Sequence, residues 1–149
     1  MGCKMRKYIF ISIGGIFGAI LRYVVRSIPS HYNGDIPINT LFINIIGSFL
    51  LALVLTGANE VFQLETDLKL GIATGFIGAF TTFSTLCKEM VTLLSNGAYL
   101  AAFSYITLSV LLGIAAAYLG IILEVAAAGS IKKNKKNTKK NSVDEREAE

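Results

Sequence analysis

The sequence has few charged residues, and this scarcity excludes a water-soluble fold. Only 16% of its 149 residues are Asp, Glu, Lys or Arg, whereas soluble domains carry about a quarter. The net charge of +4 reflects the two ends of the chain and gives no reason to expect nucleic acid as a partner. Between residues 8 and 128 the only charged residues are Arg22, Arg26, Asp35, Glu60, Glu65, Asp67, Lys69, Lys88, Glu89 and Glu124. We therefore predict an integral membrane protein.

Cysteine and histidine are also nearly absent, which excludes a disulfide framework and a zinc cluster. The chain has two cysteines, Cys3 and Cys87, and one histidine, His31, in a polar connection. Cys87 lies in an apolar stretch, where we expect it to act as a small packing residue. No Ser/His/Asp set is available within the apolar segments, so the sequence predicts no enzyme.

No acidic residue stands in the middle of an apolar segment. A proton-coupled transporter usually places a carboxylate there, so this class is disfavoured. Glu89 and Glu124 lie near predicted helix ends, where we expect them to reach the membrane interface or to pair locally. The neighbouring Lys88 is the expected partner of Glu89.

Four apolar segments are long enough to span a hydrocarbon core as helices. They cover about residues 8–28, 38–58, 70–94 and 98–123. The basic N-terminus (1–7) precedes the transmembrane domain (8–128), and a charged tail (129–149) follows, which its low-complexity composition predicts to be disordered and near anionic lipid. The first segment lacks a small-residue cleavage pattern and contains Arg22 and Arg26, so we interpret it as a retained helix.

Small residues recur at spacings that allow helices to approach closely in lipid. They are Gly14, Gly15, Gly18, Ala19, Gly47, Ser48, Gly71, Gly75 and Gly78. Four helices make a bundle too slim to enclose a wide pore, so we expect an oligomer.

Neutral polar residues within the apolar segments are the candidate site. Asn44 either ties helices together or faces a polar path, and the sequence favours neither. Arg22 can extend toward the interface, as long basic side chains do. Glycine and threonine concentrate in residues 71–85, which indicates either a helix break lining a cavity or threonine hydroxyls that bond to the preceding turn.

Three motifs resemble those of the Fluc (CrcB) fluoride channels. The run Gly78-Ala-Phe-Thr-Thr-Phe-Ser-Thr85 resembles the central signature of this family, and residues 14–23 and 39–49 agree with two further stretches. Tyr105 and Ser109 have the spacing of the family's fourth helix. The resemblance covers about residues 8 to 125.

The resemblance implies an all-α integral membrane protein that exports cytoplasmic fluoride passively. It implies an antiparallel dimer of four-helix subunits, a third helix broken near mid-membrane, and two narrow fluoride pathways. It also implies a structural Na⁺ at the interface, held by the backbone carbonyls of Gly78 and Thr81. The implied pathway residues are Arg22, Asn44, Phe83, Ser84, Thr85, Tyr105 and Ser109.

The implied roles are chemically reasonable. The Asn44 amide is an N–H donor for a dehydrating anion, and the positive ring edge of Phe83 can face one without holding it tightly. Hydroxyl groups along the path add donors, and Arg22 favours anion entry at a vestibule.

The sequence departs from the family pattern at three positions. Leu86 stands where the family has its second pore phenylalanine, and an aliphatic side chain offers no positive edge to an anion. Asn39 replaces a usual glycine, without a consequence that we can assign. Gly113 stands one turn after Ser109, where some members carry a hydroxyl.

Basic residues gather on the side that holds both termini. Lys4, Arg6, Lys7, Lys69 and the tail lysines in 132–140 lie there, against Arg26 and Lys88 on the other side. This bias predicts cytoplasmic termini in the cell membrane. Because an antiparallel homodimer must insert both ways, the bias favours pairing with an oppositely oriented homologous subunit, while a homodimer stays possible.

Two other functions are alternatives to the fluoride channel. A small four-helix multidrug or cation exporter needs an acidic residue in its first helix, and residues 8–28 contain none. A membrane assembly protein without transport would use Asn44 and the threonines only to hold helices together.

Overall fold

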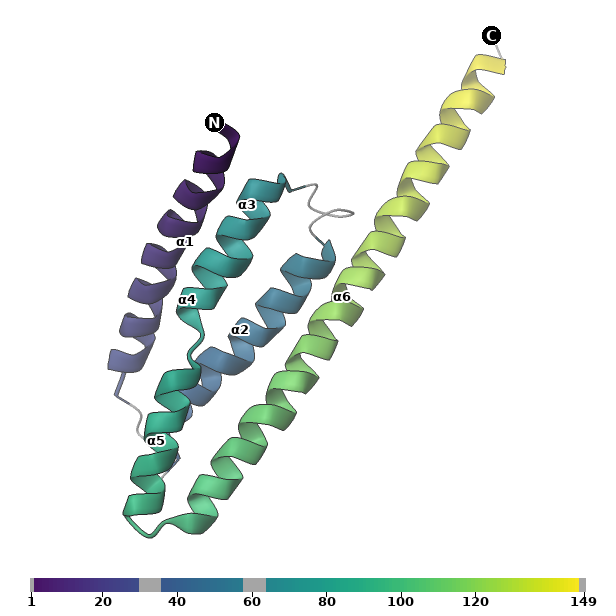
Figure 1. Ribbon diagram of the computed structural model, residues 1–149. Helices are drawn as coiled ribbons and strands as arrows, with labels where there is room; N and C mark the ends of the chain where they lie inside the picture. The colour runs from purple at the N-terminus through teal and green to yellow at the C-terminus, as the bar shows by residue number, and fades with distance from the viewer. Residues whose placement is uncertain (1, 30–35, 58–63, 148–149) are drawn as a thin grey trace.

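The chain is helical wherever the computed structural model describes regular structure. It describes residues 2–29, 36–57 and 64–147, with side chains at 5–29, 36–57 and 64–130. The elements are α1 (Gly2–Ser27), α2 (Ile38–Gly57), α3 (Thr66–Leu70), η1 (Gly71–Ile77), α4 (Gly78–Phe80), α5 (Phe83–Ser95) and α6 (Tyr99–Glu147) (Figure 1). The side chains of Cys3 and His31 lie outside these described ranges.

Four helical stretches in the described ranges are long and apolar enough to cross a membrane. They are Met5–Ser27, Ile38–Gly57, Thr66–Ser95 and Tyr99–Ser130. The predicted all-helical fold with four apolar spans is therefore confirmed. The start of α1 and the end of α6 lie toward the same end of the bundle, as an even number of spans requires (Figure 1).

The third span consists of several helical pieces. α3, η1 and α4 follow one another without a gap, and η1 has the wider π-helical hydrogen bonding that often marks functional sites. Thr81 and Thr82 then adopt extended backbone conformations, with ψ of 157° and 118°. α5 begins at Phe83, so the hydrogen-bonded helix is interrupted between α4 and α5 (Figure 1).

Glycine packing holds α1 against the first half of the third span. A Cβ at Gly14 would meet the carbonyl oxygen of Gly71, and one at Gly18 would meet that of Phe76. Gly75 lies in the same way against the backbone of Ile11. The close approach that the spacing predicts is therefore confirmed for these glycines, because no larger residue would fit. Gly15 is different, since a Cβ there meets nothing within 4 Å.

The second half of the bundle is built on α6. α2 packs along it, and Gly120 lets the two helices approach, because a Cβ there would lie 2.7 Å from the Phe49 carbonyl oxygen. α5 reaches α6 through a turn in which Gly97 has a φ of 76°, a conformation that side-chain-bearing residues rarely adopt. Leu86, Leu93, Ala102 and Tyr105 form the buried core between α5 and α6.

The backbone of α6 continues beyond the expected span. Its helix runs to Glu147, through the segment 129–149 whose composition predicts disorder. Lysine is a good helix former, and a helix already nucleated within the bundle can propagate at little further cost. The tail side chains from residue 131 lie outside the described set.

Adjacent glycines in α1 give a direct test of this packing. Gly14→Ala should lower the free energy of unfolding by about 1–3 kcal/mol, because the added Cβ collides with the Gly71 backbone. Gly15→Ala is the matched control and should be neutral or stabilising by up to about 1 kcal/mol. Thermal unfolding in detergent measures both. Equal effects of the two substitutions would contradict the packing described.

Candidate functional site

The interruption of the third span is held by one side chain from α2. The Asn44 amide nitrogen donates to the Thr82 carbonyl at 3.0 Å, and the Thr82 N–H donates to the Asn44 amide oxygen at 2.9 Å. This pair of bonds satisfies the backbone of one extended residue in an apolar environment, where unpaired groups are costly. Of the two roles that the sequence leaves open for Asn44, the structure shows the first: its amide joins α2 to the third span.

Thr82 also begins the next helix. Its hydroxyl accepts the Thr85 N–H at 3.2 Å and so caps α5. The same hydroxyl lies 2.9 Å from the Thr85 hydroxyl, to which it donates. Thr81 bonds back to the Ile77 carbonyl at 3.0 Å, so the break and the hydroxyl back-bonding that the sequence left as alternatives occur together.

These side-chain bonds release two backbone carbonyls. In a continuous helix the N–H groups of Thr82 and Thr85 would donate to the carbonyls of Gly78 and Thr81, four residues earlier. Here the two N–H groups donate to Asn44 and to the Thr82 hydroxyl instead. The Thr81 carbonyl faces the Arg22 guanidinium, whose Nη1 lies 3.5 Å away. Gly78 is exposed.

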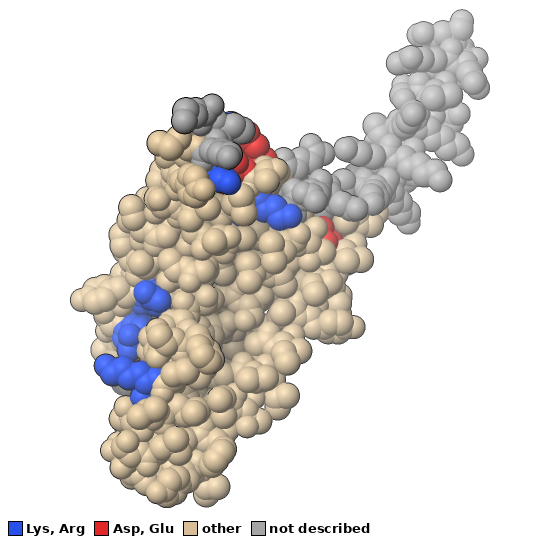
Figure 2. Space-filling model, in the orientation of Figure 1, with Lys and Arg blue, Asp and Glu red and all other residues tan. Residues whose placement is uncertain are grey.

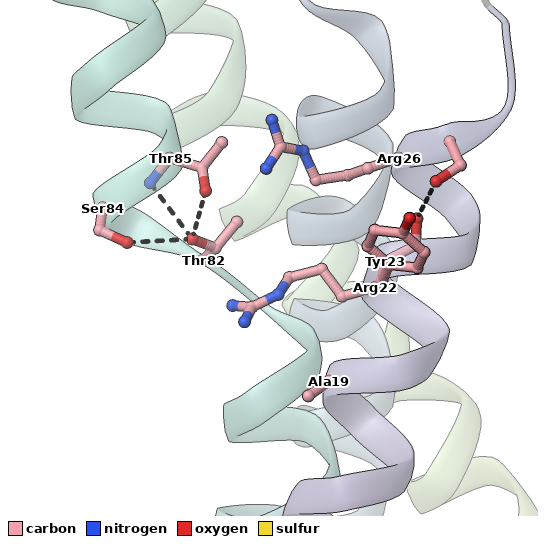
Figure 3. A pocket seen from close by; sticks show the side chains of 8 residues that line it. Ala19, Arg22, Tyr23, Arg26, Thr82, Ser84 and Thr85 are labelled. Atoms are coloured by element: carbon pink, nitrogen blue, oxygen red, sulfur yellow. Dashed lines mark hydrogen bonds between the residues drawn. The ribbon is translucent and has the colours of Figure 1, made fainter.

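A cavity of about 380 Å³ lies on one side of the break. Arg22 and Arg26 project from α1 toward the first turn of α5, where Ser84 and Thr85 lie (Figure 3). Figure 2 shows one group of basic side chains at the left side of a largely uncharged face, and further basic and acidic side chains near the upper end. This cavity therefore combines cationic groups with hydroxyl donors, which is an environment that suits an anion.

A second cavity of about 240 Å³ lies beside the same break. Asn44 and Phe83 line it, together with Ser48 and Thr81. The Phe83 side chain is 77% exposed and points away from the core of its own chain. Leu86, three residues later, is only 6% exposed and packs in the core beside Tyr105. The two positions that the family pattern pairs thus face different surroundings here.

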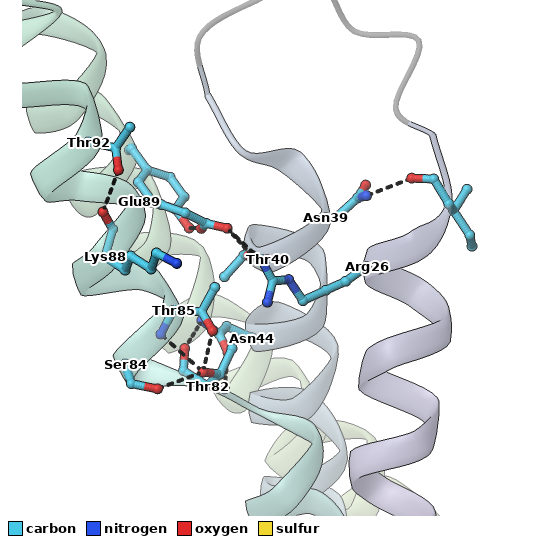
Figure 4. Close-up of polar contacts among 12 residues, drawn as sticks. Arg26, Asn39, Thr40, Asn44, Thr82, Ser84, Thr85, Lys88, Glu89 and Thr92 are labelled. Atoms are coloured by element: carbon cyan, nitrogen blue, oxygen red, sulfur yellow. Dashed lines mark hydrogen bonds and ion pairs between the residues drawn. The ribbon is translucent and has the colours of Figure 1, made fainter. Parts of the chain in front are cut away.

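Glu89 forms a polar network that the sequence did not predict. One carboxylate oxygen accepts the Thr40 hydroxyl at 2.9 Å, and the other accepts the Tyr105 hydroxyl at 2.8 Å (Figure 4). Arg26 Nη2 lies 3.6 Å from the first of these oxygens. The expected local pair with Lys88 is wrong, because adjacent residues on a helix point in different directions.

The predicted site residues fall into three groups. Arg22, Ser84 and Thr85 line the larger cavity, and Asn44 and Phe83 line the smaller one. Tyr105 is fully buried and Ser109 donates to its carbonyl at 2.7 Å, so these two lie in α6 apart from both cavities.

Sequence reasoning missed Thr40, Thr82, Arg26 and Glu89 as site residues. The charged pair at residues 88 and 89 inside an apolar stretch was the available signal for Glu89. Glu124 was also expected near the interface, but it is 5% exposed, and its Oε1 has no hydrogen-bond partner in the described part of the chain. Over that part no group of three acidic, histidine or cysteine side chains could hold a metal.

The Asn44 contact predicts a large effect on stability. Asn44→Ala leaves the Thr82 N–H and carbonyl without partners, at about 1–3 kcal/mol for each group. We expect a loss of at least about 2 kcal/mol in the free energy of unfolding in detergent. Asn39→Ala is the matched control, since this amide on the same helix makes one exposed bond to the Ile28 carbonyl. If both variants unfolded alike, Asn44 would not hold the break.

Sequence comparisons agree with this architecture. The family model for CrcB-like protein, Camphor Resistance (CrcB), matches residues 9–121. A protein of Bacillus anthracis named fluoride-specific ion channel FluC 1 is 42% identical over 122 residues, which cover 80% of this chain and 89% of that protein. The fluoride-specific ion channel FluC of Thermosipho melanesiensis is 38% identical over 122 residues, covering 78% and 94% of the two chains.

A third relative extends the similarity to a further organism. The fluoride-specific ion channel FluC of Ignicoccus hospitalis is 40% identical over 117 residues, covering 78% of this chain and 93% of its own. The matched region includes the whole of the second and third spans, with the interruption, and most of the first and fourth. The chain belongs to the CrcB family of membrane proteins.

Proposed function

We propose that this chain is a subunit of a fluoride channel in the plasma membrane that lets cytoplasmic fluoride leave passively. The observation that carries the proposal is sequence similarity. Proteins named fluoride-specific ion channels are 38–42% identical to this chain over 78–80% of its length. The two cavities at the break support it, because residues 44, 81–85 and the α1 arginines line them without a carboxylate. An anion path requires donors and excludes fixed negative charge.

In this proposal the residues that line the cavities replace water around fluoride. Arg22 raises the local anion concentration, and Ser84 and Thr85 supply hydroxyl donors. One amide hydrogen of Asn44 is bonded to Thr82, which leaves the other for the anion. The exposed Phe83 ring offers its positive edge. Tyr105 and Ser109 lie on α6 outside both cavities, and only the family resemblance assigns them to the path.

A second subunit would complete the path. In one chain Phe83 is largely exposed, and polar residues such as Ser84 are exposed beside it within an apolar span. Hydroxyl and backbone groups facing lipid are unfavourable, so a protein partner suits this face better than acyl chains. We propose that the partner is antiparallel, either another copy or an oppositely oriented homologue, with the interrupted helices of both near mid-membrane.

A structural Na⁺ would fit the released carbonyls. Gly78 and Thr81 are the residues whose helical donors are withdrawn by Asn44 and Thr82, and carbonyl oxygens suit an alkali cation. The Arg22 guanidinium near the Thr81 carbonyl competes with a cation there. The ion would neutralise carbonyl dipoles that two subunits bring together, and it would not be transported.

The orientation proposal rests on the basic residues at the end that holds both termini. Arg6 lies there and pairs with Glu65 and Asp67, and Lys69 follows in α3. Cytoplasmic termini and a single orientation would require the oppositely oriented homologue as the second subunit. Labelling of single cysteines placed at the termini of a Cys3/Cys87-free chain tests this in intact cells. Equal labelling from both sides would refute a single orientation.

Fluoride transport is the decisive test. Liposomes containing this chain, alone or with an oppositely oriented homologue, should release fluoride and retain chloride. Phe83→Ile removes the aromatic edge while preserving an exposed apolar side chain, and it should lower efflux at least about tenfold if a ring edge faces the anion. Absence of fluoride efflux in both preparations would favour an exporter of other substrates or an assembly role.

The sodium proposal predicts a dependence on the monovalent cation. Replacing Na⁺ by N-methylglucamine should abolish dimerisation and fluoride efflux, whereas Thr81→Ser should be mild because only a backbone atom binds. Within the described chain a Cβ at Gly78 would meet only the Ala73 carbonyl oxygen, at 3.8 Å. The substitution Gly78→Ala should therefore leave the fold of one subunit unchanged. A dimerisation defect in this variant would then come from a disturbed ion site or from a collision with the second subunit. Unchanged dimers without Na⁺ would exclude a structural cation.

A further inference from the structure

The Glu89 carboxylate occupies an unusual place in this chain. It belongs to α5, and it binds Thr40 of α2 and Tyr105 of α6 with one oxygen each. Its side chain is only 19% exposed. The ionised form of a partly buried carboxylate beside the arginine-lined cavities repels an anion. Some other group must offset this charge if the path is to conduct.

Arg26 is the cation placed to do this. Its Nη2 lies 3.6 Å from the Glu89 oxygen that also accepts from Thr40 (Figure 4). Arg26 also lines the 380 Å³ cavity with Arg22, and it lines an adjoining cavity of about 320 Å³ beside Glu89 and Lys88. One guanidinium therefore faces both the anion-attracting cavity and the carboxylate.

We propose that Arg26 is a positioning residue for anion entry, which offsets the negative charge of Glu89 next to the cavity that both α1 arginines line. The proposal rests on the fluoride-channel function proposed above. The Arg26 side chain is 47% exposed, so water screens part of the interaction. Its effect should accordingly be moderate and should depend on Glu89.

Lys88 provides a matched control for this contact. It is a cation lining the same 320 Å³ cavity, next to Glu89 in sequence, and the described residues include no ion pair to it. Arg26→Gln should lower the initial rate of fluoride efflux from liposomes by about three- to tenfold, while Lys88→Gln should change it less than about twofold. Arg26→Lys should retain at least about half of the wild-type rate, because the charge remains.

The double variant Arg26→Gln/Glu89→Gln tests whether Arg26 acts through Glu89. The alternatives are that its positive charge acts on the anion directly, or that its loss impairs folding. If Arg26 acts by neutralising Glu89, removing both charges should recover at least about half of the lost rate. A double variant as slow as Arg26→Gln would overturn the proposal, and so would equal losses in Arg26→Gln and Lys88→Gln.

Thermal unfolding of the same variants in detergent gives a readout independent of transport. Arg26→Gln and Glu89→Gln should show non-additive shifts in the unfolding midpoint, since the two groups are in contact. Additive shifts would overturn the contact itself. If the shifts were non-additive but the wild-type channel released no fluoride, the ion pair would stand, and the fluoride function, with the role of Arg26 in it, would be rejected.

Discussion

The two hydrogen bonds between the Asn44 amide and the Thr82 backbone are the constraint on which the site depends. They satisfy one extended residue so that the third span can stop at Phe80 and resume at Phe83. In an apolar environment an interrupted helix without such partners would cost several kcal/mol for each unpaired group. The two cavities beside the break and the released carbonyls of Gly78 and Thr81 follow from this arrangement.

Close packing of glycines determines which side chains reach the break. Gly14 and Gly18 place α1 against the backbone of η1, so α1 cannot shift sideways without a collision. One turn beyond Gly18, Arg22 then lies beside Thr81, and Arg26 lies within 3.6 Å of Glu89. The small residues thus position the charged ones, although they touch no ion themselves.

The bundle has a hydrogen-bonded interior and an exposed face at the break. Glu89 accepts hydrogen bonds from Thr40 and Tyr105, which joins three helices inside one subunit. Phe83 and Ser84 are exposed at the break, where a hydroxyl group that faces lipid is unfavourable. This exposed face is the physical reason for proposing a second subunit there.

Much of the architecture could be predicted from local patterns. The scarcity of charge predicts four apolar spans, because a hydrocarbon environment accepts few charged residues. The glycine spacings predict close helix contacts, and Gly14, Gly18 and Gly75 make them, whereas Gly15 does not, because it lies on another face of the same helix. The run of residues 78–85 identifies the family, since its motif is local and specific.

The contacts across the bundle were decided only by the tertiary structure. From the sequence alone Asn44 could tie helices together or face a polar path, and its bonds to Thr82 come from a residue far along the chain. Proximity in sequence predicts Lys88 as the partner of Glu89. The partners in the structure are Arg26 of α1, Thr40 of α2 and Tyr105 of α6. Composition and periodicity determine which segments enter the membrane, because transfer into lipid is a property of each segment. Hydrogen-bond partners depend on how the helices are rotated against each other, and that rotation is set by the packing of all of them together.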